Sequence, residues 1–212
     1  MSLLRSTIAL EAEPRIESDT HYLRPPVIGD FRAWAELRAA SREFLKPWEP
    51  LWPRDDLTKS GFRRRLRKYA RDRRDGRGYP FLLFSTRTGE LLGGLTLSNV
   101  RRGVCQSATM GYWMGAPFAG NGHMSHAVRL VLPHCFDVLG LHRVEAACLP
   151  NNEPSIHLLQ KAGFRREGYA RKYLLINGKW QDHLLFACLA EDHAFACGPT
   201  AVSGGRTMKE IL

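Results

Sequence analysis

The chain has 212 residues, of which 44% are hydrophobic and 25% are charged. This length and composition suit one domain with a sizeable core, alone or with tails. The five cysteines are scattered and form no Cys-x-x-Cys pair, which argues against a disulfide framework or a zinc site and favours a reducing cytoplasm. The formal net charge of +10 favours anionic partners.

Two apolar stretches deserve comparison with export and membrane signals, and neither matches. Residues 103–128 carry no Asp, Glu, Lys or Arg, but glycines, Pro117 and Asn121 interrupt them, so a buried strand and loop are predicted. The apolar run at the N-terminus is short and is soon followed by acidic residues, unlike a signal peptide. We therefore expect no membrane contact.

The first part of the chain predicts a strand, a helix and a loop. An N-terminal extension over residues 1–20 precedes a strand expected at about 21–27. A helix follows at about 30–44, because apolar residues recur there at helical spacing. The prolines between residues 47 and 53 then predict an irregular loop.

The net charge is concentrated in a basic segment over residues 62–77. Phe62, Leu66 and Tyr69 are spaced for one face of an amphipathic helix. Clustered cations bind RNA by releasing phosphate counterions, so contact with RNA or the ribosome is one interpretation. An ordinary solvated helix face is the other. The cations are Arg63, Arg64, Arg65, Arg67, Lys68, Arg71, Arg73, Arg74 and Arg77.

The middle of the chain predicts a meander of strands and then a helix. Strand-like runs at 79–86 and 91–100 flank the hairpin signal at 88–90, and a third strand is expected at about 107–114. The helix, at about 124–132, has apolar residues at helical spacing. The order of these elements is compatible with a mixed α/β fold.

A glycine-rich turn, Ala119 to Ser125, joins that strand to that helix. Glycine lets the backbone approach a ligand closely, and the unpaired amides of a new helix attract anions such as a pyrophosphate. Dinucleotide-binding loops and ordinary connections share this pattern, so the turn alone does not identify a ligand. After a break at Gly140 we expect a strand at 142–149, a helix, two strands and, at 194–212, a mobile tail.

Two groups of residues resemble a known family. The turn resembles the pyrophosphate loop of the GNAT superfamily of N-acetyltransferases, Gln/Arg-x-x-Gly-x-Gly/Ala: Gly122 fits, whereas Ala119 and Met124 depart from it. Residues 149–152 and 163–183 resemble the RimJ branch, which acetylates N-terminal alanines of ribosomal proteins.

This resemblance extends over about His21 to Asp192 and implies one acetyltransferase domain over residues 21–193. Its fold would be α/β, with a mixed, mostly antiparallel central sheet flanked by helices. Splayed strands near 112–115 and 144–149 would form the cleft for acetyl-CoA, the cosubstrate. The resemblance implies direct transfer to an amine and no metal.

The same resemblance places the cofactor on one strand end, on the glycine turn and on one asparagine. Backbone amides near Met114 would bind the pantetheine arm and stabilise the oxyanion. Asn152 matches an asparagine that contacts the cofactor, although such a residue also begins helices. The expected cofactor-binding residues are Trp113, Met114, Ala119, Gly120, Asn121, Gly122, His123, Met124, Ser125 and Asn152.

The residue expected to protonate the leaving thiolate differs from the family pattern. Many members carry a tyrosine where this chain has Leu159. Ser155 is then the nearest catalytic candidate. Alternatively, Ser155 has only a structural role at the helix start, and a water donates the proton.

The base that takes the proton of the amine has two candidates. Glu145 is the best-placed carboxylate and the catalytic residue that we expect, two residues from Ala147, where some relatives carry a glutamate. Asp182 with His183 is the second option, because imidazole titrates near neutral pH, but these residues also suit a lock between turn and strand.

The chemistry of the amine favours a protein N-terminus as acceptor. Near pH 7.4 an α-amine with a pKa of about 7.8 is roughly 30% neutral, whereas neutralising a lysine with a pKa of about 10.4 costs roughly 4 kcal/mol. A weak base therefore suits an α-amine, which the resemblance identifies as an alanine of a ribosomal protein. The alternatives are an acetyltransferase for a small amine and a ribosome- or RNA-binding protein with weak or no catalysis.

Overall fold

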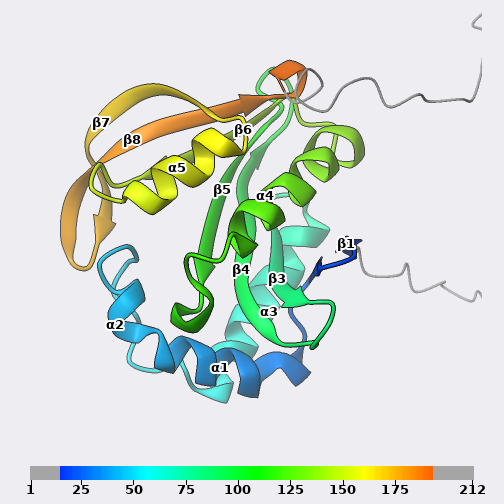
Figure 1. The fold of residues 1–212 in the computed structure, drawn as a ribbon, viewed down its shortest axis with the longest axis vertical. Helices are drawn as coiled ribbons and strands as arrows, with labels where there is room; N and C mark the ends of the chain where they lie inside the picture. Colours follow the sequence, from blue (N-terminus) through cyan, green and yellow to red (C-terminus); the bar gives the residue numbers. More distant parts are fainter. Residues whose placement is uncertain (1–14, 193–212) are drawn as a thin grey trace, which may run out of the picture.

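The computed structural model describes residues 15–192, so the predicted tail at 194–212 and most of the predicted extension lie outside the described residues. Within residues 15–192, one sheet has the strand order β1-β2-β3-β4-β5-β6-β8-β7, and only β5 and β6 pair in parallel (Figure 1). The strands are β1 (Ile16–Glu17), β2 (His21–Arg24), β3 (Tyr79–Ser85), β4 (Leu91–Arg101), β5 (Ser107–Met114), β6 (Arg143–Cys148), β7 (Arg165–Ile176) and β8 (Lys179–Leu189).

Helices cover both faces of this sheet. α4 and α5 pack on one face, and α1 and α3 pack on the other (Figure 1). The helices are α1 (Phe31–Ala40), α2 (Arg42–Leu45), α3 (Lys59–Arg74), α4 (His123–Pro133) and α5 (Glu153–Lys161), with short helical turns η1 (Ile28–Asp30), η2 (Ala116–Phe118) and η3 (His134–Val138).

The predicted fold class and order of elements are confirmed, with two local differences. The helix predicted over 30–44 is divided at Ser41, a buried residue whose hydroxyl accepts a hydrogen bond from the Ala116 amide (2.8 Å) instead of facing solvent. Residues 16–17, inside the predicted extension, pair with β2 as an edge strand. The domain boundary at residue 21 stays a prediction.

The sequence of β3 explains why both faces of the sheet are covered. Its run of residues 81–84 is apolar throughout. Phe81 and Leu83 belong to the core beneath α4 and α5, whereas Leu82 and Phe84 belong to the core beneath α1 and α3. A continuous apolar run is what a strand buried on both faces requires, because successive side chains point to opposite faces.

Polar side chains fix the starts of α3 and α5. The Thr58 hydroxyl accepts the Gly61 amide (3.1 Å) at the start of α3, and a side chain at Gly61 would collide with the Asp55 carbonyl. Asn152 Oδ1 accepts the Ser155 amide (3.2 Å) at the start of α5. Both caps satisfy amides that a helix leaves unpaired, so Asn152 does begin a helix.

β5 and β6 are paired over only part of their length. Their parallel register joins residues 107–109 to residues 143–145. From Met110 onward β5 is paired with β4 alone, while β6 continues along β8 as far as Cys148. The two strands therefore separate, as predicted, and the edge of β5 toward β6 offers backbone groups without a strand partner.

Candidate active site

The glycine turn before α4 has the backbone geometry of an anion site. Gly120 and Gly122 have φ angles of +79° and +77°, which favour glycine. Gly122 is the N-cap of α4 and provides no side-chain cap for the first amides of the helix. Unpaired amides at a helix N-terminus bind phosphate groups. This turn fits a pyrophosphate.

The other predicted cofactor residues lie on the same turn or at the end of β5. Ala119, Asn121, His123 and Ser125 flank the two glycines along the turn and the first residues of α4. Met124 is buried in the core beneath α4, which accommodates its larger side chain at this position of the motif. Trp113 and Met114 lie on the part of β5 that has separated from β6. Their contacts with the cofactor, and that of Asn152, stay predictions.

Tyr112 of β5 is a site residue that sequence reasoning missed. Its hydroxyl lies 2.6 Å from Ser155 Oγ at the start of α5. This contact joins β5 to the helix that follows β6. Burial raises the pKa of Tyr112 well above its ordinary range, so the hydroxyl stays protonated. Alternation along β5 and the need of a buried tyrosine for a polar partner were the available signals.

The thiol of Cys148 lies beside this pair at the end of β6. Burial raises its pKa, and a hydrogen bond with the Ser155 side chain acts in the opposite direction. Burial also raises the pKa of Cys135, in the core, to about 12. Neither thiol has the environment of a reactive cysteine, which agrees with direct transfer to the amine.

A groove crosses the face of the sheet that carries α1 and α3, between α3 and strands β4 to β6. It consists of two cavities that share Tyr69 and Thr96: one of about 760 Å³ is lined by Thr109 and Glu145, and one of about 360 Å³ is lined by Gly111. We call it the α3 groove. Gly111 is exposed, and a side chain there would meet no atom within 4 Å.

Glu145 lies on the α3 groove and is already bonded on both oxygens. Its carboxylate accepts hydrogen bonds from Arg101 Nη2 (3.0 Å) and Arg143 Nε (2.9 Å). It also pairs with Thr109, where β5 and β6 are still joined. Its role as a base stays a prediction.

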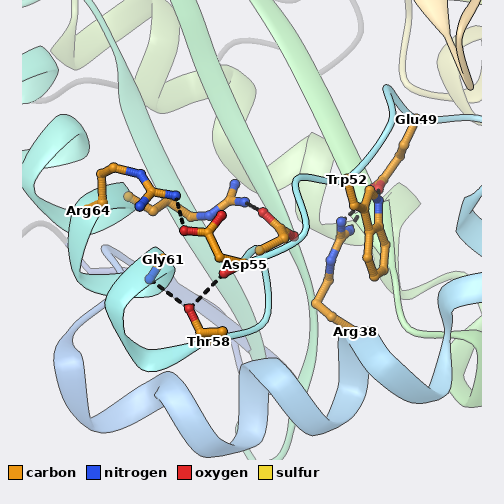
Figure 2. A network of polar contacts seen from close by, with 9 residues as sticks. Arg38, Glu49, Trp52, Asp55, Thr58, Gly61 and Arg64 are labelled. Atoms are coloured by element: carbon orange, nitrogen blue, oxygen red, sulfur yellow. Dashed lines mark hydrogen bonds and ion pairs between the residues drawn. The ribbon is translucent and has the colours of Figure 1, made fainter.

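The loop over residues 47–53 is anchored to α1 and to the β7–β8 turn. Arg38 of α1 donates to both oxygens of Glu49 (2.6 and 2.7 Å), and its guanidinium lies 4.2 Å from the Trp52 ring (Figure 2). The same guanidinium lies 4.9 Å from the Trp113 ring. The Glu49 carbonyl accepts the amide of Asn177, in the β7–β8 turn, at 2.9 Å. The loop and the β7–β8 turn therefore form an arch.

Asp182 holds a bulge in β7. Its two oxygens accept the Tyr169 hydroxyl (2.5 Å) and the Lys172 amide (2.8 Å), and Lys172 has a φ of +48°. The Tyr169 bond, followed by the Lys172 amide, lowers the pKa of Asp182, which favours its ionised form. The structural alternative for Asp182, a lock between strands, is what its contacts show.

Three histidines meet where β2 contacts the start of α4. His21 Nε2 lies 2.7 Å from His123 Nδ1, and the rings of His21 and His126 lie 4.8 Å apart. Burial first, then the charges of His126 and His123, lower the pKa of His21 to about 4. Burial, then Arg129 and His123, lower the pKa of His126. Both imidazoles are neutral near pH 7.

We expect the folded protein to lose stability as the pH falls from about 6.5 toward 4. An unfolded histidine binds a proton near pH 6.5, whereas His21 stays neutral down to about pH 4. The unfolded state therefore takes up more protons in this window and becomes favoured. Thermal unfolding across these pH values should show Tm falling less steeply for His21→Gln than for His157→Gln, an exposed control. Equal slopes would contradict this assignment.

Most cations of the basic segment have partners within the protein. Within residues 15–192, Arg63, Arg67 and Arg71 have no ion pair; all three are exposed, and their four-residue spacing puts them in one stripe along α3. The ion pairs of the segment include Arg64–Asp55, Arg65–Asp56, Lys68–Asp72, Arg74–Asp75 and Arg77–Asp75.

Residues 15–192 contain neither a membrane-spanning helix nor a group of side chains that could bind a metal ion. No helix between residues 15 and 192 has the length and apolar character needed to cross a membrane. No cluster of His, Cys, Asp and Glu in that part of the chain could hold a metal ion.

Comparison with known proteins agrees with this geometry. The model of the acetyltransferase (GNAT) domain matches residues 21–165. The probable N-acetyltransferase YjcK of Bacillus subtilis (strain 168) is 36% identical over 177 residues, covering 84% of this chain and 98% of that protein. The ribosomal protein uS5-alanine N-acetyltransferase of Escherichia coli (strain K12) is 35% identical over 181 residues, covering 84% and 93%.

A solved structure agrees as well. RimJ of Mycobacterium smegmatis, in complex with CoA-disulfide, matches with a TM-score of 0.78 and 35% identity, over 84% of this chain and 88% of that one. The residues matched by the family model include the glycine turn, the separated strands β5 and β6, and α3. The chain therefore belongs to the GNAT acetyltransferase family and is an acetyl-CoA-dependent N-acetyltransferase.

Proposed function

We propose that the protein acetylates the α-amine of a protein N-terminus, in particular an alanine of a ribosomal protein. The arch carries this proposal: the bond between Asn177 and Glu49 joins the β7–β8 turn to the loop that lines the α3 groove. A narrow chain end can pass beneath such an arch more easily than a folded surface. The uS5-alanine and RimJ relatives support the same acceptor.

The residues present fit acetyl-CoA. The turn at Gly120 and Gly122, with the first amides of α4, would hold the pyrophosphate. The free edge of β5 over residues 110–114 would bind the pantetheine arm through backbone groups. The bound cofactor supplies the acetyl thioester, and β5 amides near Met114 would stabilise the oxyanion.

Ser155 and Tyr112 would deliver the proton to the departing sulfur. Because Tyr112 stays protonated, its hydroxyl can donate to Ser155 Oγ, 2.6 Å away. The Ser155 hydrogen, which can also reach the Cys148 thiol, would then turn to the sulfur of the cofactor. Tyr112 therefore acts through Ser155 and positions it.

Loss of Ser155 should be felt more than loss of Tyr112. We expect Ser155→Ala to lower kcat on the order of 10²-fold, because proton transfer by one positioned group contributes about that much or more. Tyr112→Phe should cost less, about tenfold, and the double variant should be no slower than Ser155→Ala, because the two residues act in series. Steady-state kinetics checks this. Effects that multiply in the double variant would show independent roles.

The acceptor is identified by a set of peptides that differ only in the first residue. Peptides beginning with Ala, Ser or Met, a lysine peptide blocked at its N-terminus and a polyamine are compared by kcat/KM, with mass spectrometry locating the acetyl group. The proposal predicts the highest kcat/KM for the alanine peptide. Turnover of the polyamine alone would support the small-amine alternative.

We also propose that the stripe of Arg63, Arg67 and Arg71 contacts RNA of the ribosome. Each phosphate contact contributes about −0.9 to the slope of log K against log salt on a duplex. Replacing all three by glutamine should therefore reduce the slope of ribosome binding by roughly 2–3. Arg64→Gln, whose guanidinium is paired with Asp55, is the control. An unchanged slope in the triple variant would rule out the contact.

A further inference from the structure

His183 of β8 lies on the face of the sheet that carries the α3 groove. Along β8, Ala187 pairs with Glu145 of β6, and Leu184 pairs with Cys148. Opposed residues share a face and successive residues alternate, so His183 falls on the same face as Ala187 and Glu145. His183 is next to Leu184, whose pairing with Cys148 is the last between β8 and β6. At that end of β6, β5 is no longer paired with β6. His183 therefore lies near the end of β6, one strand away from the gap between β5 and β6.

The imidazole of His183 has an oriented lone pair. Its Nδ1 lies 3.0 Å from the carbonyl oxygen of Gln181. A carbonyl only accepts hydrogen bonds, so Nδ1 carries the hydrogen, and in the neutral ring the lone pair is on Nε2. The two residues of the predicted Asp182–His183 pair therefore differ. Both oxygens of Asp182 accept hydrogen bonds from β7, whereas the lone pair of His183 Nε2 is not used in the bond to Gln181.

This Nε2 has no hydrogen-bond partner within residues 15–192, although His183 is only 2% exposed. Nε2 itself is not fully covered by the protein. The fully covered side-chain atoms without a partner in this part of the chain are Arg38 Nε and Asp56 Oδ2. A buried ring nitrogen normally has a partner. The small exposed surface of His183 therefore includes Nε2, which a water can reach.

Tyr173 connects His183 to the groove. Its ring meets the imidazole edge-on, with the ring centroids 5.8 Å apart. Tyr173 also lines the larger cavity of the α3 groove with Glu145. The bulge that Asp182 holds at Lys172 directly precedes Tyr173. The bulge thereby fixes the wall of the groove next to the imidazole.

We propose that His183 Nε2 is the catalytic base that takes the proton of the acceptor amine, directly or through one water. This inference rests on the proposed function. The amine nitrogen forms a bond to the thioester carbon, the carbon–sulfur bond breaks, and the amine proton passes to Nε2 and then to solvent. The sulfur receives a proton from Ser155, which regains one from solvent. Glu145, held by two arginines, is the competing base.

The test is the pH dependence of kcat for the full-length protein with acetyl-CoA and an alanine-ended peptide. His183→Gln should lower kcat near pH 7 by on the order of 10²-fold or more. The deficit should shrink by up to about sevenfold toward about pH 9, because the neutral fraction of an α-amine rises from about 14% to nearly all over that range. Added imidazole should partly restore His183→Ala. The titratable and charged groups that line the larger cavity are Tyr173, Tyr69, Glu145, Lys68, Asp72, Arg77 and Arg101. Glu145→Gln is therefore measured in parallel and should keep the acidic limb of the profile.

Two further measurements separate catalysis from folding. CoA affinity and Tm should be nearly the same in wild type and in His183→Phe, which keeps a ring in the core. A wild-type kcat and pH profile in His183→Gln and His183→Ala would overturn the inference, as would a loss that is equal at every pH, or loss of the acidic limb in Glu145→Gln alone. A wild-type protein that acetylates no α-amine would overturn the proposed function and this inference with it.

Discussion

Gly122→Val should weaken CoA binding by roughly 10- to 100-fold in a protein that still folds. Gly122 has a φ of +77°, and a Cβ there would meet no atom within 4 Å, so the substitution introduces backbone strain rather than a collision. Such strain costs on the order of 1–3 kcal/mol. If the turn relaxes to avoid it, the amides at the start of α4 lose their alignment with the pyrophosphate, and each 1.4 kcal/mol lost from binding is about tenfold in affinity.

Gly89→Val is the matched control for this prediction. Gly89 has a φ of +70° and equally open space around a Cβ, but it lies in the β3–β4 hairpin. Both variants should therefore lose similar stability, and only Gly122→Val should change the dissociation constant for CoA measured by calorimetry. An equal loss of affinity in the two variants would mean that the turn has no special part in binding.

Gly111→Leu should lower kcat/KM for the peptide on the order of 10²-fold or more while CoA affinity stays nearly unchanged. Gly111 is exposed on the α3 groove and has free space around it, so the fold should accept a side chain. The leucine would occupy the cavity of about 360 Å³ and displace the amine from the thioester. A misplacement of about 1 Å can cost 10²-fold in rate. CoA would still meet the backbone edge of β5.

Gly29→Leu is the control here, because Gly29 is exposed in η1 and also has no atom within 4 Å of a Cβ. It should keep wild-type kinetics. Peptide turnover at the wild-type rate in Gly111→Leu would show that the acceptor does not use this groove.

The elements of the fold were predictable because their signals are local. The apolar run at 81–84 marks a buried strand, and Asn152 with its neighbours marks a helix start. The division at Ser41 was not, because it depends on a hydrogen bond to Ala116, far away in the chain. Local patterns cannot show such a contact.

The part of the candidate site that a local sequence motif forms could be predicted. The parts that depend on contacts between separate strands could not. The glycine turn stands before α4 as expected. The bond between Tyr112 and Ser155 depends on how far β5 separates from β6, and the place of His183 depends on a register in β8 and a bulge in β7. The partners of Glu145, two arginines on β4 and β6, likewise appear only once the strands are paired.

The central claim is that the acceptor is the α-amine of a chain end, and one peptide tests it most directly. The peptide begins with a free alanine, contains one internal lysine and is incubated with acetyl-CoA and the protein. Mass spectrometry then locates the acetyl group. The account predicts acetylation at the alanine nitrogen and no turnover once that nitrogen is blocked. Acetylation of the lysine, in the free or the blocked peptide, would contradict it.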